Sequence, residues 1–137
     1  MSADAGARAP VRLLVVLPSP PLRLLAVAAF REALARGGRE LVAIEAGSAF
    51  EALWLAPREA PTGAVVALDL PVLSGEELVG LLRARPAHRQ LPVVVVAPHS
   101  DESAPARADR TGAAALLRTP FDGNAVASAL ASAGVGA

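Results

Sequence analysis

The sequence has few of the side chains on which protein chemistry most often depends. Its 137 residues include no cysteine and no tyrosine, a single tryptophan and a single methionine, and no lysine. The absence of cysteine excludes both a disulfide framework and a thiolate nucleophile. A chain of this length is long enough to bury a core in one domain without disulfides or a structural metal.

Charge and long hydrophobic runs are also limited. The 13 basic and 13 acidic residues cancel, so no net field favours nucleic acid or an anionic membrane. The apolar runs are too short to span a bilayer, and residues 1–10 contain no signal-peptide core. We therefore expect a cytoplasmic domain without nucleic-acid or membrane partners, with a disordered tail at 1–10, a folded part at 11–133 and a short tail at 134–137.

What the sequence does contain is an alternation of strand and helix patterns. Short aliphatic runs predict five buried strands, at Leu13–Val16, Leu41–Ile44, Ala64–Leu68, Pro92–Val96 and Ala114–Leu117. Helical spacing and capping residues predict helices over Leu22–Arg36, from Ser48 through Leu55 with Pro57 as the end, from Ser74 with Leu78, Leu81 and Leu82 on one face, late within Asp101–Arg110, and after Asp122. This alternation predicts an α/β fold, a five-stranded parallel sheet with helices on both faces.

Asp69 is the natural candidate site residue. It lies in the run Val65–Leu70, directly after the apolar residues Val65 to Leu68, and open α/β sheets place their sites at the carboxyl ends of strands. Few groups that would make this carboxylate reactive accompany it. The first strand runs into Leu17 and Pro18 instead of acids, and Asp4 is the only acid before Glu32.

Three segments in register carry a resemblance to a known family. They are Ala67-Leu68-Asp69-Leu70, then Leu91-Pro92-Val93-Val94-Val95-Val96, and Gly112-Ala113 followed by Thr119-Pro120-Phe121. With them, residues 11–133 resemble the receiver domain of two-component response regulators. The resemblance implies a CheY-like, flavodoxin-like fold with strand order 2-1-3-4-5 and a role in signal transduction. It also implies a cis peptide bond before Pro120.

The departures from the family pattern concern the phosphorylation site. Two metal-holding acids are replaced by Leu17 and Pro18, a hydroxyl residue by Ala97, and a lysine by Thr119. The loop Leu70–Gly75 is about two residues shorter than the loop that the family has after its phospho-acceptor. Phosphoryl transfer to a carboxylate depends on charge neutralisation by a divalent ion and basic groups, which these positions no longer supply. The resemblance therefore implies a degenerate pseudo-receiver that has no metal, cofactor or enzymatic activity and has an inactive Asp69.

Two alternatives remain open. Asp69 is still phosphorylated if another group, such as Arg118, replaces the lost charges; otherwise it is a leftover, partly buried carboxylate bonded by backbone amides, Ser19 or Thr119. A small flavodoxin-like enzyme or ligand-binding domain that uses the altered pocket is the second alternative. Ser19 and Ser74 lack the surroundings of a hydrolase nucleophile.

The remaining candidates carry weaker signals. His88 and His99 lack acids at ligand spacing and are typical of solvated loop residues, with His99 the one within reach of the Asp69 pocket. Phe50 and Trp54, four residues apart on a helix, are more typical of core than of a binding platform.

Receivers commonly bind partners through the fourth helix, fifth strand and fifth helix. Here that face carries small or apolar residues with arginine around them, at Ala106, Ala113, Leu116, Arg118 and Ala129, with Arg107 and Arg110 nearby. Close approach of small residues buries area, and arginine supplies directional pairing. We therefore expect a protein partner of a signalling pathway, or a second copy of the chain, at this face.

Overall fold

The structure is a computed structural model that describes residues 9–136. Its strands are β1 (Val11–Val16), β2 (Leu41–Ala46), β3 (Gly63–Ala67), β4 (Val93–Pro98) and β5 (Ala115–Thr119). Its helices are α2 (Pro20–Arg36), α3 (Ala49–Glu59), α4 (Gly75–Arg83), a 3-10 turn η1 (Pro86–His88), α5 (Ala104–Thr111) and α6 (Gly123–Ala133). The tail predicted at 1–10 lies almost entirely outside the described residues.

The strands form one parallel sheet with the order β2-β1-β3-β4-β5, which confirms the predicted topology. Val16 of β1 pairs with Val66 of β3, and Ala67, the last residue of β3, pairs with Val96 of β4. The carboxyl ends of β1, β3, β4 and β5 therefore meet at one edge of the sheet.

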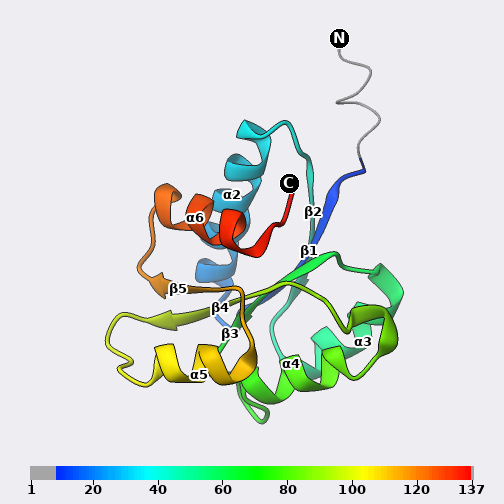
Figure 1. Cartoon of the computed structure of the whole chain (residues 1–137), viewed down its shortest axis with the longest axis vertical. Helices are drawn as coiled ribbons and strands as arrows, with labels where there is room; N and C mark the ends of the chain where they lie inside the picture. Colours follow the sequence, from blue (N-terminus) through cyan, green and yellow to red (C-terminus); the bar gives the residue numbers. More distant parts are fainter. Residues whose placement is uncertain (1–8, 137) are drawn as a thin grey trace.

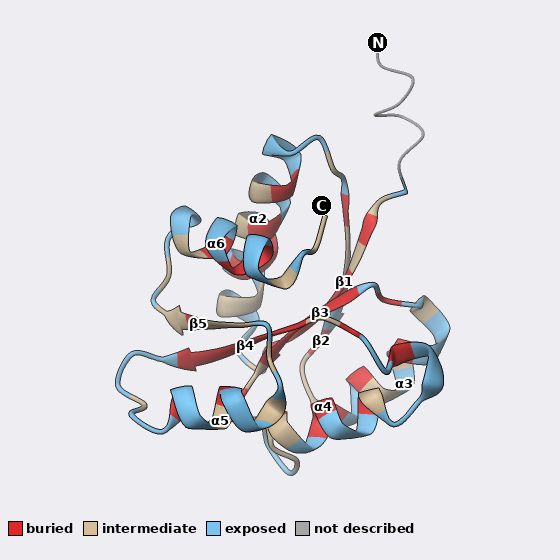
Figure 2. Cartoon of the chain, viewed as in Figure 1, coloured by how far each residue is buried: buried red, intermediate tan, exposed pale blue. Residues whose placement is uncertain are grey.

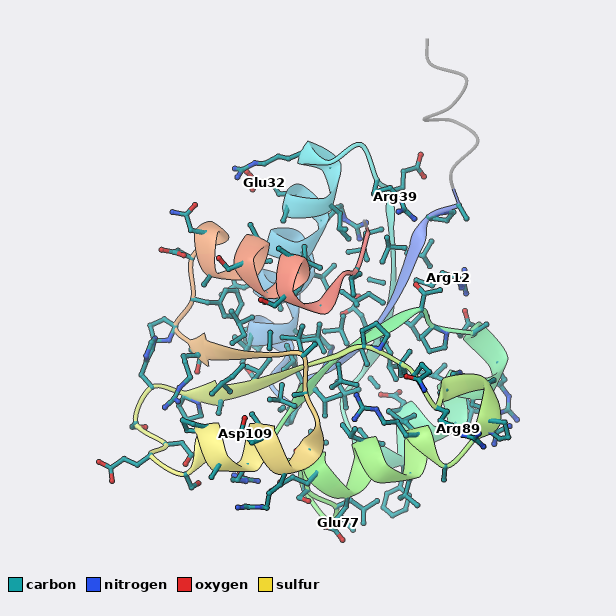
Figure 3. The ribbon with its side chains drawn as sticks, viewed as in Figure 1. Arg12, Glu32, Arg39, Glu77, Arg89 and Asp109 are labelled. Atoms are coloured by element: carbon teal, nitrogen blue, oxygen red, sulfur yellow. The ribbon has the colours of Figure 1, made fainter. Side chains whose placement is uncertain are left out.

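Helices cover both faces of the sheet (Figure 1). α2 and α6 pack on one face, and α3, α4 and α5 pack on the other, so each side encloses its own apolar core. The central strands are buried on both sides, whereas the helices keep an exposed outer surface (Figure 2). This burial explains why the strand sequences are nearly continuous aliphatic runs. Charged side chains, including Glu77, Arg89 and Asp109, lie on the outside of the helical layer (Figure 3).

Local capping residues start the helices as predicted. Ser74 and Glu77 form a complete capping box at α4, and the Asp122 carboxylate accepts from the backbone N–H of Ala125 at the start of α6. α5 is short and starts late, at Ala104, with proline in its first turn. At α3 the box is incomplete because the Glu51 carboxylate accepts from the N–H of Gly47 instead of Ser48.

The predicted end of α3 is wrong. The helix continues through Pro57 to Glu59 and ends at Ala60, which adopts a left-handed conformation with φ of 48°. Pro57 lies in the last turns, where its missing N–H costs one intrahelical hydrogen bond near a helix end. Four strands also run one or two residues longer than their aliphatic runs, as in β2, which continues to Ala46. β3 keeps the predicted length but begins and ends one residue earlier than predicted, at Gly63 and Ala67.

Two predicted apolar faces are rotated. α3 turns Ala49, Ala52 and Ala56 toward the sheet, so the predicted core residues Phe50 and Trp54 are instead 59% and 57% exposed. The Arg58 guanidinium lies over the Trp54 ring at 4.0 Å. On α4 the buried residues are Gly75, Leu78, Val79 and Leu82, which leaves Leu81 exposed.

The remaining differences concern His88 and the C-terminal end. His88 is buried in η1 and not solvated as expected, and its Nδ1 has no hydrogen-bond partner among the described residues. Val135 packs against the core beside α2 and α6, so the packed part extends beyond Ala133. No helix in the part of the chain that the structure describes is both long enough and apolar enough to cross a membrane.

Candidate functional site

A cavity of about 260 Å³ opens at the edge where the strands end. Three of the four positions predicted to replace the family's site residues line it, namely Pro18, Ala97 and Thr119, together with Asp69. The other lining residues are Ser19, Leu22, Ala67, Val96 and Pro98. Leu17 does not line this cavity, because its side chain is fully buried in the core on the α2 side.

The cavity is mainly apolar. Pro18 and Ala97 bring no side-chain oxygen, and Thr119 and Ser19 bring only neutral hydroxyls. Pro20 and Pro21 begin α2, so the start of this helix lacks two of its backbone N–H donors. Among residues 9–136, no three His, Cys, Asp or Glu side chains come together in a way that could hold a metal ion. Mg²⁺ requires oxygen ligands, so these residues do not fit the metal site of the family that the sequence resembles.

The Asp69 carboxylate lies at the rim of this cavity. Its side chain is 70% exposed, and its Oδ1 accepts a hydrogen bond from Nη1 of Arg107 at 2.9 Å. The expected partners, backbone amides, Ser19 or Thr119, do not appear in the hydrogen bonds of the described residues. The prediction of a partly buried Asp69 is therefore wrong, because the chain turns away from the sheet at Leu68 and Asp69.

Arg107 on α5 is the centre of the polar cluster at this edge. A guanidinium has five N–H donors, and each of them has an acceptor here. Nη1 donates to the carboxylates of Asp69 and, at 3.4 Å, of Asp101. Nη2 donates to the Leu68 carbonyl at 3.0 Å. Nε and Nη2 together form a bidentate pair with the Glu76 carboxylate, at 3.0 and 2.7 Å. One side chain thus joins the β3–α4 loop, the start of α4 and the β4–α5 loop.

The charges in this cluster stabilise one another. Hydrogen bonding and the charge of Arg107 lower the pKa of Glu76, against a smaller opposing effect of burial. The hydroxyl and N–H of Ser103, with a contribution from Arg107, lower the pKa of Asp101. Glu76 and Asp69 raise the pKa of Arg107 further above its already high usual value. Glu76, Asp101 and Arg107 are therefore ionised at neutral pH.

Neither Arg118 nor His99 joins this cluster. Nη2 of Arg118 donates to the carbonyl oxygens of His99 and Asp101, and no hydrogen bond between Arg118 and Asp69 occurs among the described residues. The hypothesis that Arg118 compensates for the lost charges at Asp69 therefore has no support in the geometry. Nε2 of His99 lies 3.2 Å from the Pro120 carbonyl oxygen, and His99 is not among the residues that line the Asp69 cavity. The peptide bond between Thr119 and Pro120 is cis, as the resemblance implied.

A larger hollow of about 530 Å³ runs along β5 and α6. Leu116, Arg118 and Ala129 of the predicted interaction face line it, as do the exposed serines Ser128 and Ser132. Ala129 itself is buried, because it faces the core at the floor of the hollow, which corrects its expected place at the centre of an exposed face. Ala113 packs toward the α4 and α5 side, and Ala106 is exposed on α5; neither lines the hollow.

The Arg107 cluster is the feature that the sequence analysis missed. Its contacts join residues 31 to 39 positions apart along the chain, apart from the one to Asp101. No short motif marks such pairs, and Arg107 was expected only at the rim of the interaction face.

The comparison with known proteins agrees with the fold. The response regulator protein FleR of Pseudomonas aeruginosa is 35% identical over an alignment of 102 residues, and the match covers 72% of this chain and 21% of FleR. The chain thus spans about a fifth of the length of this curated relative.

Solved structures cover nearly the whole fold. The receiver domain of NtrX from Brucella abortus superposes with a TM-score of 0.71 and 26% identity, covering 88% of this chain and 96% of that one. A receiver domain of a sensor histidine kinase from Pseudomonas aeruginosa, solved with magnesium in its active-site cleft, superposes with a TM-score of 0.73 and 18% identity, covering 92% of this chain and 99% of that one.

No family model matches the sequence. The match to FleR covers 72% of this chain and that to the NtrX receiver domain covers 88%, and both confirm the resemblance that the three sequence segments carry. The chain is therefore a receiver-like domain, similar in sequence and in fold to the receiver domains of two-component response regulators.

Proposed function

We propose that this chain is a pseudo-receiver, a signalling domain that acts through protein recognition and without phosphorylation. The observation that carries the proposal is the cavity at the strand ends. In place of a metal-binding acid, a hydroxyl residue and a lysine it presents Pro18, Ala97 and Thr119. A carboxylate is a poor phosphoryl acceptor unless cations neutralise the charge that develops around the transferred group.

The state of Arg107 supports the same conclusion. Arg107 is the basic side chain that contacts Asp69, and all five of its N–H donors already have protein acceptors. It has no donor left for a phosphoryl oxygen. Phosphorylation of Asp69 would also replace its carboxylate with a phosphoryl group that carries a charge of about −1.5 to −2 beside Glu76 and Asp101, and this additional negative charge disfavours the product.

The hollow along β5 and α6 is the surface that we assign to recognition. β5 is an edge strand, so one side of its backbone has no neighbouring strand. Small side chains of α6 beside this edge allow a partner to approach closely, whereas the Nε of Arg118 is buried and is not accessible to a partner. An apolar floor beside an open strand edge suits a protein segment that pairs its backbone with β5.

The phosphorylation part of the proposal is tested with the native chain. The protein is incubated with acetyl phosphate and Mg²⁺, and the covalent phosphoryl group is sought by intact-mass spectrometry. We expect no adduct. Stoichiometric labelling that disappears in Asp69→Asn would refute the proposal and establish an atypical receiver.

The recognition part is tested by substitutions in α6. Ser128→Arg places a long side chain into the hollow, whereas Ala131→Arg places the same side chain on an exposed position of α6 outside it. We expect Ser128→Arg to weaken self-association or partner binding at least tenfold, measured by light scattering and by pull-down from the native host. Equal effects of the two variants, or none, would exclude this surface.

The apolar cavity also favours the second alternative, a site for a small molecule. A volume of about 260 Å³ fits a small apolar compound with a hydroxyl or a cation directed at Thr119 or Asp69. Filling the cavity by Ala97→Leu decides between the two: a pseudo-receiver retains its partner binding, whereas a ligand-binding domain loses its ligand.

A further inference from the structure

The strand that leads to the candidate site ends two residues before its carboxylate. β3 finishes at Ala67, which pairs with Val96 of β4, and one last backbone bond from the N–H of Leu68 to the Val96 carbonyl follows at 2.9 Å. Leu68 and Asp69 then form a bend that leads away from the sheet. The residue of β3 that lies at the cavity is therefore Ala67.

The loop after β3 is anchored at the same point. The N–H of Gly75 donates to the Leu68 carbonyl at 2.8 Å, and a Cβ on Gly75 would collide with the Ala67 carbonyl oxygen. The loop thus closes against Ala67 and Leu68, and its structural length runs from Ala67 to Gly75. Counted from Asp69, the loop is about two residues shorter than the resemblance implies. Counted from Ala67, this shortfall disappears.

We propose that Ala67, and not Asp69, stands where a receiver domain presents its phospho-acceptor, so that this position carries a methyl group. This inference rests on the proposed function and deepens it, because it leaves no carboxylate at the acceptor position. Ala67 and Asp69 both line the cavity, but Ala67 belongs to the strand, whereas the Asp69 carboxylate lies at the rim and accepts a hydrogen bond from Arg107. Asp69 is then a positioning residue for Arg107 and not the remnant of an acceptor.

Reintroducing carboxylates tests this assignment by cation binding. Pro18→Asp supplies one acid from the end of β1, and Leu17 stays unchanged because it is fully buried. Into this background, Ala67→Asp is introduced with and without Asp69→Asn. Mn²⁺ is the probe, and its affinity is measured by electron paramagnetic resonance, with circular dichroism as the folding control.

We expect Ala67→Asp to raise the affinity of the Pro18→Asp protein for Mn²⁺ at least tenfold, because two carboxylates then face one cavity. We expect Asp69→Asn to change it less than twofold in either background. A folded Pro18→Asp/Ala67→Asp protein without this gain overturns the assignment. So does an affinity of Pro18→Asp alone that Asp69→Asn abolishes.

The second comparison needs no change at position 67, so the test stands even if Ala67→Asp prevents folding. The outcomes also separate this inference from the proposed function. Labelling of the native chain at Asp69 would overturn both. An unlabelled native chain whose Pro18→Asp variant binds Mn²⁺ through Asp69 would overturn only the assignment of Ala67.

Discussion

Replacing Arg107 with glutamine should destabilise the domain more than any other single change on its charged surface. Glutamine keeps part of the side-chain length but removes the charge and most of the donors. The side chain of Arg107 is 16% exposed, and that of Glu76, its bidentate partner, is 27% exposed. Removing one partner of a fully buried pair costs roughly 3–5 kcal/mol, and exposed pairs contribute roughly 0–1 kcal/mol.

The pair between Arg107 and Glu76 lies between these limits. The pair with Asp69 adds little, because that carboxylate is 70% exposed and well hydrated. We therefore expect Arg107→Gln to lower the free energy of unfolding by about 2 kcal/mol. For a domain of this size the thermal midpoint should fall by about 7 °C.

The matched control is Arg110→Gln. Arg110 lies one helical turn away on α5, its side chain is 67% exposed, and it contacts the same Glu76 only at 3.9 Å. Its loss should cost less than about 0.5 kcal/mol. Urea unfolding of Arg107→Gln, Glu76→Gln and the double variant should give a coupling energy of about 1 kcal/mol or more. Equal stability of Arg107→Gln and Arg110→Gln would refute the central role of Arg107.

Three further predictions follow from the same contacts. In the folded state the pKa values of Glu76 and Asp101 lie below their usual values of 4.5 and 3.8. Their contribution to the free energy of unfolding is therefore complete above the usual values, and it is lost as the pH falls through the lowered folded-state values. The stability difference between the native chain and Arg107→Gln should therefore be constant near pH 6 and shrink below about pH 4; a difference that grows with acid would contradict this sign. Gly75→Ala should destabilise the domain by about 2 kcal/mol or more, because the new Cβ collides with backbone atoms of Ala67 and Leu68. Gly80→Ala on the same helix, where nothing lies within 4 Å of the new atom, should stabilise it by about 0.5–1 kcal/mol, and chemical denaturation compares the two. In hydrogen exchange, the amides of residues 68–75 should exchange at least tenfold faster in Arg107→Gln than in Arg110→Gln, because Arg107 is the one of these two arginines that donates to the Leu68 carbonyl.

The fold could be predicted because its signals are local. Each strand is an aliphatic run, and Ser74 with Glu77 or Asp122 marks a helix start within four residues of sequence. The outward position of Phe50 and Trp54 could not be predicted from spacing alone. Both the alanine stripe and the aromatic pair of α3 have helical spacing, and the sheet selected the alanines because a small side chain allows the closer approach.

The site was predicted in part. The replaced positions Pro18, Ala97 and Thr119 were found because each lies at the end of a recognisable strand, and the structure brings them to one cavity. The partner of Asp69 was missed because it comes from α5, 38 residues later. Pairs at such separations leave no periodic pattern, and the sequence does not distinguish Arg107 from the other arginines as the partner of Asp69.

Arg107 gives this domain a cation that cannot leave. A phosphoryl group and a divalent ion are exchangeable, so a site that depends on them has two states, bound and empty. A guanidinium is attached to the chain and stays charged at every physiological pH, and here the carboxylates raise its pKa further. The loops that it joins, at Leu68 and at Asp101, are therefore tied to α5 in the absence of any ligand. Because Arg118 of β5 donates to the Asp101 carbonyl, the same tie reaches the β5 edge of the proposed recognition surface. If Arg107→Gln leaves partner binding unchanged while it loosens residues 68–75, the recognition surface does not depend on these loops; weaker binding without unfolding would show that it does.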